Sequence, residues 1–173
     1  MRAFLAIEPS DALRARIDEA ARALSLGGMK RTPASLLHLT LRFLGDIADP
    51  AVIVRAVEPV CARHRAFALP VAGGGAFGAH VAWVGVRDDG RLAALADDVE
   101  RALVSAGAPA ADKPFAAHIT IARAKKRVRL DASALAGVGA LGALAVDDVV
   151  LFESALTASG VAYTPRARMP LAR

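Results

Sequence analysis

Residues 36–46 read LLHLTLRFLGD, and this stretch decides the fold because apolar and polar side chains alternate along it. Successive side chains of a β-strand point to opposite faces, so His38 and Thr40 share one face while Leu39 and Leu41 share the other. The apolar face predicts a strand packed on a hydrophobic core. The other face predicts an imidazole and a hydroxyl held side by side on a rigid element.

The same pattern occurs again close to half a chain length away. Residues 115–123 read FAAHITIAR, in which His118 and Thr120 share one predicted face and Ile119 and Ile121 share the other. One such motif is ordinary for a half-buried strand. Here, however, two of the four histidines have a threonine at the same offset, with aliphatic residues interleaved. Two such strands facing each other would form a two-histidine site with matched hydroxyl donors.

Length and composition narrow the class of protein. At 173 residues and 55% hydrophobic content, the chain can bury one core, and disorder is excluded. We expect a single bilobal domain over residues 1–173. Lys and Arg outnumber Asp and Glu by 22 to 17, which favours an anionic partner such as nucleic acid or a phosphate ester. Cys61 is the only cysteine, so a disulfide within the chain is excluded and a reducing, cytoplasmic location is expected.

Hydrophobic periodicity predicts alternating strands and helices. The predicted helices cover residues 11–26, 50–65 and 91–105. The predicted strands cover residues 2–8, 36–44, 66–72, 80–86, 116–124, 146–154 and 162–169, whereas 134–144 has no clear pattern. This order predicts an α+β fold of two pseudo-symmetric lobes, whose antiparallel-rich sheets face a central cleft and carry helices outside.

One long uncharged stretch needs a separate interpretation. Residues 66–86 contain no Lys, Arg, Asp or Glu, which is nearly the length of a membrane span. Pro70 and the run Gly73-Gly74-Gly75 interrupt it, so we predict two strands around a glycine turn and no membrane segment. The glycine run lacks the Lys-Ser/Thr ending of a phosphate-binding P-loop.

The chain resembles the 2H phosphoesterases, and within them the RNA 2′,3′-cyclic phosphodiesterase (2′-5′ RNA ligase) family. The resemblance rests on HLTLRFLGD and HITIAR, the opening RAFLAIEP, the AWVGV strand around Trp83, and the ending LFESALTASGVAYTPRARMPL. The chain departs from the family in three places. Ala117 replaces a usual proline, His80 replaces a common arginine, and the Phe77-Gly78 turn lacks its usual proline.

The resemblance implies metal-independent hydrolysis of RNA 2′,3′-cyclic phosphodiester ends to 2′-phosphomonoesters, with reversible 2′-5′ ligation as a further activity. His38 would donate a proton and His118 would accept one, because imidazole can serve as acid or base near neutral pH. Thr40 and Thr120 would donate hydrogen bonds to the phosphate oxygens. Arg123 would also bind the phosphate. No cofactor, metal, membrane or obligate protein partner is expected.

Strand alternation makes different predictions for two arginines. Arg42 falls on the predicted face of His38 and Thr40. Arg123 falls on the face of Ile119 and Ile121, away from His118, and reaches the site only if the strand ends or bulges after Ile121.

Basic residues are concentrated after the second motif. Residues 113–129 contain six Lys or Arg and no acidic residue, which is consistent with either a solvated hairpin or a surface for an RNA backbone. We favour the second interpretation and assign Lys30, Arg31, Lys125 and Lys126 to RNA binding. The exposed faces of Phe43, Phe77 or Trp83 would suit base stacking, although aromatic residues on apolar strands are more often core.

Three alternative functions remain open from the sequence. One is a 2H enzyme that acts on a small cyclic-phosphate nucleotide. The second is a non-catalytic RNA-binding module of the same fold, which is disfavoured because both histidines and both threonines are present. The third is a histidine-based metal site, which would need carboxylates that neither motif strand supplies.

Overall fold

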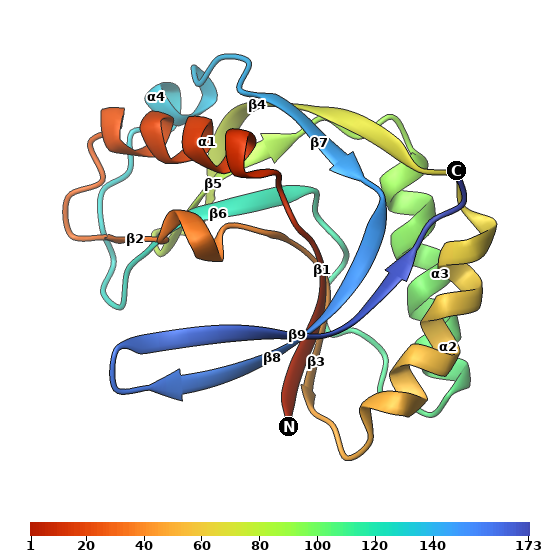
Figure 1. The fold of residues 1–173 in the computed structure, drawn as a ribbon. Coiled ribbons are helices and arrows are strands. Elements are labelled where there is room, and N and C mark those ends of the chain that lie inside the picture. The colour runs from red at the N-terminus through yellow and green to blue at the C-terminus, as the bar shows by residue number, and fades with distance from the viewer.

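A computed structural model describes all residues from 1 to 173 as two antiparallel sheets with helices packed on their outer faces (Figure 1). This confirms the predicted α+β class. The elements in chain order are β1 (Arg2–Ile7), α1 (Asp11–Ala23), β2 (Lys30–Arg31), the 3-10 helix η1 (Ala34–Leu36), β3 (Leu39–Asp46), α2 (Pro50–Arg63), β4 (Phe67–Phe77), β5 (Val81–Val86), α3 (Arg91–Ser105), β6 (His118–Arg123), α4 (Ala132–Ala136), β7 (Gly142–Val146), β8 (Asp148–Thr157) and β9 (Gly160–Pro170).

Each motif strand belongs to a different sheet. The first sheet has the order β3-β1-β8-β9, and the second has the order β2-β6-β5-β4-β7, with every neighbouring pair antiparallel. Strands β3 and β6 also contact each other where the two sheets meet. The two His-x-Thr pairs are therefore brought to the junction of the lobes, as the repeated motif predicts.

The apolar faces of the motif strands lie in one core. Leu39, Leu41, Ile119 and Ile121 are all buried, and they belong to a single cluster of 35 buried residues drawn from both sheets. Burial of this apolar area is the main favourable term in folding, at about 25 cal/mol per Å². Because the interleaved residues are anchored in this way, the orientation of His38 and His118 toward the opposite face follows from strand geometry.

Two helices cross from one lobe to the other. Helix α1 follows β1 of the first sheet but packs on β6 and β7 of the second, whereas α3 follows β5 of the second sheet but packs on β3 and α2. Ser10 and Asp49 begin α1 and α2 by accepting hydrogen bonds from the first-turn amides of Leu13 and Ala51. Because α1 and α3 each pack on the opposite sheet, they fix the relative position of the two sheets. The width of the space between the sheets is fixed in the same way. No helix is both long enough and apolar enough to cross a membrane.

The predicted glycine turn is wrong. Strand β4 runs through Gly73, Gly74 and Gly75, and the chain turns later, at Gly78, where φ is 57°. Gly74 and Gly75 are needed because β5 leaves no room for side chains there: a Cβ would lie 2.6 Å from the carbonyl oxygen of Trp83 at Gly74 and 2.5 Å from its Cζ2 at Gly75. The Trp83 indole therefore lies directly on the backbone of β4.

Some helices and strands begin or end a few residues away from the predicted positions, and others were not predicted. Helix α1 ends at Ala23 rather than near residue 26, and the unassigned segment 134–144 contains the end of α4 and the start of β7. The two-residue strand β2 pairs with the end of β6, matching Lys30 to Arg123. A strand this short has no periodicity to detect, so only its pairing partner defines it.

Candidate active site

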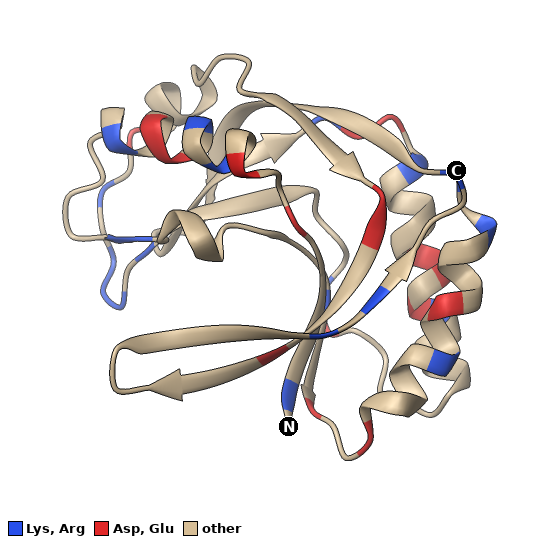
Figure 2. Cartoon of the chain, viewed as in Figure 1, with Lys and Arg blue, Asp and Glu red and all other residues tan.

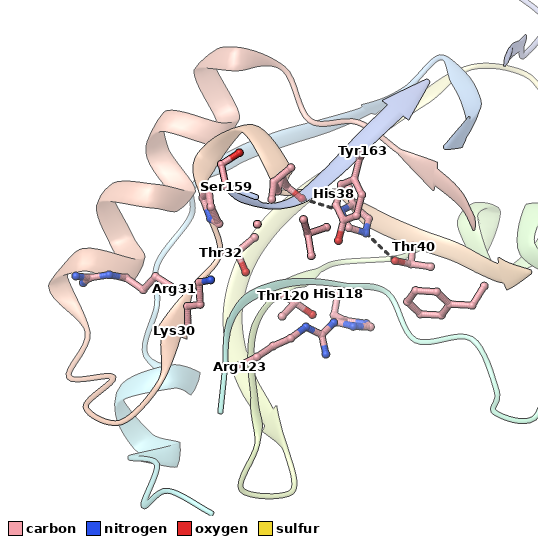
Figure 3. A pocket seen from close by; sticks show the side chains of 15 residues that line it. Lys30, Arg31, Thr32, His38, Thr40, His118, Thr120, Arg123, Ser159 and Tyr163 are labelled. Atoms are coloured by element: carbon pink, nitrogen blue, oxygen red, sulfur yellow. Dashed lines mark hydrogen bonds between the residues drawn. The ribbon is translucent and has the colours of Figure 1, made fainter. Parts of the chain in front are cut away.

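The two His-x-Thr pairs line one cavity between the sheets. It has a volume of about 260 Å³, and Figure 3 shows His38, the residue before β3, and His118, the first residue of β6, facing it from opposite sides. Neither imidazole is buried in hydrocarbon, because both residues retain partial exposure. The polar and aromatic lining residues are Lys30, Arg31, Thr32, His38, Thr40, Phe43, His118, Thr120, Arg123, Ser159 and Tyr163.

Both histidines are held in the same orientation by the backbone. Nδ1 of His38 lies 2.7 Å from the carbonyl oxygen of Leu36, and Nδ1 of His118 lies 2.7 Å from that of Ala116. A carbonyl oxygen only accepts hydrogen bonds, so Nδ1 carries a proton in each ring. Nε2 is therefore the atom that each imidazole presents to the cavity for acid or base chemistry.

The two pairs differ in their internal hydrogen bonding. Nε2 of His38 is 2.9 Å from Oγ1 of Thr40, so the hydroxyl donates to the neutral ring. Nε2 of His118 makes no equivalent bond with Thr120, although both residues line the cavity. If His38 is protonated, Nε2 becomes a donor, and the Thr40 hydroxyl proton is released for another acceptor in the cavity.

Burial lowers the pKa of both histidines below the ordinary value of 6.5, which favours the neutral form of both rings at pH 7. The positive charge of Arg123 lowers each pKa further, and Arg14 and His118 add to this effect at His38. Burial also raises the pKa of the Tyr163 phenol, which therefore stays neutral. A bound anion would raise the pKa of both histidines, because a nearby negative charge favours the imidazolium.

Matching β-bulges change the side-chain alternation in both motif strands. In β3, Leu41 has no partner on β1, because Thr40 pairs with Ala6 and Arg42 pairs with Leu5. In β6, Ile121 is likewise unpaired, since Thr120 pairs with Trp83 and Ala122 with Ala82. An extra residue in one strand shifts the alternation by one position.

The bulges decide which later side chains reach the cavity. Arg123 lines it, which meets the condition of a bulge after Ile121. Phe43 occupies the equivalent position in the other motif and lines the cavity with 63% of its surface exposed. One lobe therefore presents a cation and the other an aromatic ring at matching places beside the histidines.

Arg42 does not share the cavity face, so strict alternation gives the wrong position for it. Its side chain lies on the opposite side of β3, where Nε donates to the carboxylate of Glu100 on α3. The bulge at Leu41 is the physical reason, because it places Leu41 and Arg42 on the same side of the strand.

Aromatic rings surround each imidazole. The rings of Phe4 and Tyr163 lie 4.9 Å and 5.3 Å from that of His38, and Phe77 lies 4.8 Å from His118. Sequence reasoning missed Tyr163 as a site residue. Tyr163 is on β9, and the position of its ring beside His38 depends on the order β3-β1-β8-β9, which no local pattern reveals.

The charge around the cavity suits an anion. No acidic residue lines it, whereas Arg123 lies inside and Lys30 and Arg31 are exposed at its edge. Lys125 and Lys126 are exposed in the loop after β6 and do not line the cavity, but Figure 2 shows that this loop and β2 gather Lys and Arg on one side of the molecule. No group of three His, Cys, Asp or Glu side chains is arranged to hold a metal ion.

Comparison of the sequence with known proteins indicates the same family as the paired motifs. A model of the 2′-5′ RNA ligase superfamily matches residues 9–155. The chain is 31% identical over 171 residues to an RNA 2′,3′-cyclic phosphodiesterase of Archaeoglobus fulgidus, covering 94% of this chain and 96% of that protein. It is 33% identical over 144 residues to one of Aeropyrum pernix, covering 78% and 82%. The chain belongs to the 2′-5′ RNA ligase superfamily.

Solved structures share the whole fold. TT0787 of Thermus thermophilus superposes with a TM-score of 0.84 at 25% identity, covering 99% of this chain and 98% of that one. E. coli LigT complexed with 3′-AMP superposes with a TM-score of 0.80 at 27% identity over the same shares. The family resemblance read from the paired motifs is therefore confirmed.

Proposed function

We propose that this chain hydrolyses RNA 2′,3′-cyclic phosphate ends to 2′-phosphomonoesters by two-histidine acid–base catalysis. The observation that carries the proposal is the lining of the cavity: two His-x-Thr pairs, Arg123 and the edge residues Lys30 and Arg31 converge on it, and no acidic residue does. The names of the Archaeoglobus fulgidus and Aeropyrum pernix relatives support the same activity.

The reaction needs a base and an acid on opposite sides of phosphorus. In the proposed step, Nε2 of His118 accepts a proton from water while the water oxygen attacks phosphorus. The P–O3′ bond breaks, and protonated Nε2 of His38 gives its proton to O3′. Each positioned acid or base of this kind is worth about 10²–10⁴ in rate.

The neighbouring donors stabilise the charge on the phosphate. The hydroxyls of Thr40 and Thr120 and the guanidinium of Arg123 donate to the non-bridging oxygens, where negative charge builds up in the transition state. Substrate binding also prepares the acid, because the phosphate charge favours protonation of His38. That protonation frees the Thr40 hydroxyl from Nε2 of His38, and the hydroxyl then donates to the phosphate.

Phe43 supports the assignment of His38 as the acid. Its exposed ring is on the same strand as Thr40 and contacts Phe4, which also contacts His38. A nucleobase stacked on Phe43 would put its ribose, and hence O3′, on the His38 side of the phosphate. His118 then faces the attacking oxygen.

The same chemistry in reverse joins RNA ends. If the 5′-hydroxyl of a second RNA replaces water, the product is a 2′-5′ phosphodiester with a free 3′-hydroxyl. We propose this ligation as a second activity of the same residues, and it requires no further group.

The test uses an oligonucleotide that ends in 2′,3′-cyclic phosphate. We expect conversion to the 2′-phosphate at an unchanged rate in the presence of a chelator. Binding without turnover would instead indicate an RNA-binding module. Turnover of small cyclic-phosphate nucleotides with no preference for the oligonucleotide would favour the small-nucleotide alternative, and activity that depends on added metal would contradict the mechanism.

The pH profile follows from the lowered histidine pKa values. The active free enzyme has one ring protonated and one neutral, and the population of that form peaks midway between the two pKa values. Because both lie below 6.5, kcat/KM should peak below pH 6.5. Bound phosphate raises both values, so the kcat profile should shift to higher pH. A kcat/KM profile centred above pH 7 would contradict this expectation.

Replacing Phe43 with alanine should lower kcat/KM for the cyclic oligonucleotide about tenfold, because one base–aromatic stack is worth ~1–3 kcal/mol. The ring is largely exposed, so the variant should keep its free energy of unfolding. Phe43→Tyr is the matched control and should retain activity. Equal kcat/KM for the alanine and tyrosine variants would rule out stacking at this position.

The double variant Lys125→Ala, Lys126→Ala should weaken binding of oligonucleotide substrates at low salt. Each lost phosphate contact should reduce the slope of log affinity against log salt by about one. Adenosine 2′,3′-cyclic phosphate has no backbone beyond the site, so its kcat/KM should be unchanged. A parallel loss with both substrates would remove these lysines from the proposed RNA surface.

A further inference from the structure

A second exposed aromatic ring lies on the His118 side of the site. Phe77 is at the end of β4 and is 43% exposed. Its ring centroid is 4.8 Å from that of His118, with the planes at 82°, so the two rings meet edge to face. Phe77 does not line the cavity itself, but its ring contacts the imidazole of His118, which does.

The Phe77 ring is held in place by Trp83 and the backbone of β4. Trp83 packs against Phe77 with 5.4 Å between ring centroids, and the Trp83 indole in turn lies on Gly75, where a Cβ would approach Cζ2 to 2.5 Å. Gly75 therefore allows the indole and phenyl rings, tilted at 38° to each other, to pack together beside the imidazole. Such a preorganised apolar surface, next to the proposed general base His118, is suited to binding another planar group.

Hydrolysis makes no use of this surface. Water needs no platform, and the base of the cyclic nucleotide is accounted for by Phe43 on the His38 side. In-line displacement places the incoming oxygen opposite the departing O3′. Since O3′ is on the His38 side, the incoming oxygen is on the His118 side. Any alcohol that replaces water must approach there.

We propose that Phe77 stacks the base of an acceptor nucleoside whose 5′-hydroxyl replaces water in the ligation reaction. This inference rests on the proposed function. The acceptor oxygen forms a bond to phosphorus as the P–O3′ bond breaks. Nε2 of His118 takes the 5′-hydroxyl proton and His38 supplies a proton to O3′, so atoms and charge balance with no other reactant.

The partition between transfer and hydrolysis tests this role. The donor is an oligonucleotide ending in 2′,3′-cyclic phosphate, and the acceptor is 2′,3′-dideoxyadenosine, whose only hydroxyl is at the 5′ position. The ratio of 2′-5′-linked product to 2′-phosphate is measured for the wild-type protein, Phe77→Ala and Phe77→Tyr. Methanol, which has no nucleobase, serves as the control acceptor, and its transfer product is the methyl ester of the 2′-phosphate.

We expect saturable transfer to dideoxyadenosine by the wild-type protein and by Phe77→Tyr. Phe77→Ala should lower the transfer ratio about tenfold, as expected for a lost stacking partner. The ratio with methanol should be the same in all three proteins. The ratio is insensitive to any general weakening of His118, because transfer and hydrolysis use the same base.

Three outcomes would overturn the inference while leaving the proposed hydrolysis intact. The first is hydrolysis by the wild-type protein with no transfer to dideoxyadenosine. The second is an unchanged ratio in Phe77→Ala, which would limit Phe77 to supporting His118. The third is a raised KM for the donor with an unchanged ratio, which would assign the ring to the donor strand. Failure of the wild-type protein to hydrolyse the donor would instead contradict the proposed function.

Discussion

Alanine at His38 or at His118 is expected to lower kcat for cyclic phosphate opening by about 10²–10⁴, because each ring supplies a proton transfer that water replaces poorly. Both rings are oriented by backbone carbonyls, and the only side-chain hydrogen bond that either substitution removes is the one between His38 and Thr40. The measurement is the single-turnover rate with an oligonucleotide ending in 2′,3′-cyclic phosphate, together with the free energy of unfolding of each variant.

The double variant His38→Ala, His118→Ala adds a sharper test. Residues that act together in one step lose far less in combination than the product of their separate losses. We therefore expect the double variant to be close to either single variant. His64→Ala is the control, because His64 pairs with Asp98 between α2 and α3, away from the cavity, and its loss should leave the rate unchanged. Fully multiplicative losses would mean that the two rings contribute independently and do not act as a coupled pair.

Arg123→Ala should lower kcat by about 10²–10³, the loss typical of removing one donor from a developing negative charge. Arg123→Lys should recover part of this, since lysine keeps the charge but lacks the planar fork that donates to two oxygens at once. The measurement is kcat for the three proteins under saturating substrate.

The pH profile of Arg123→Ala gives a second, independent readout. Arg123 lowers the pKa of both His38 and His118, so its removal should raise both values and move the kcat/KM optimum to higher pH. Arg123→Lys should leave the optimum near that of the wild-type protein. A normal kcat with an unmoved optimum in Arg123→Ala would exclude the guanidinium from the site.

Much of the site was predictable because it depends on strand alternation. His38 and Thr40 share a face with each other, as do His118 and Thr120, and the leucines and isoleucines between them are buried, as the two-residue period requires. The repeat of the motif also indicated that the pairs would meet. Their meeting depends on contact between β3 and β6, which are separated along the chain by α2, β4, β5 and α3.

Alternation fails where the pairing partner decides the geometry. The bulges at Leu41 and Ile121 are defined by register with β1 and β5, and nothing in the local sequence marks them. They move Arg42 off the cavity face and bring Phe43 and Arg123 onto it. This is why alternation alone placed Arg42 on the wrong face and left the position of Arg123 conditional.

Long-range packing accounts for the remaining errors. A run of three glycines usually indicates a turn, but here it continues β4 because the Trp83 indole occupies the space of a side chain at Gly75. Tyr163 reaches His38 only because β8 pairs with β1 and β9 folds back along β8. Both features depend on strand order, which local periodicity does not encode.

The central claim is that two imidazoles act on one phosphate from opposite sides. A crystal structure of the protein with adenosine 2′-phosphate, the product of adenosine 2′,3′-cyclic phosphate, tests it most directly. We predict the phosphate between the two rings, with O3′ within hydrogen-bond distance of Nε2 of His38 and a phosphate oxygen within reach of Nε2 of His118. A phosphate that contacts only one imidazole, or binds outside the cavity, would contradict the account.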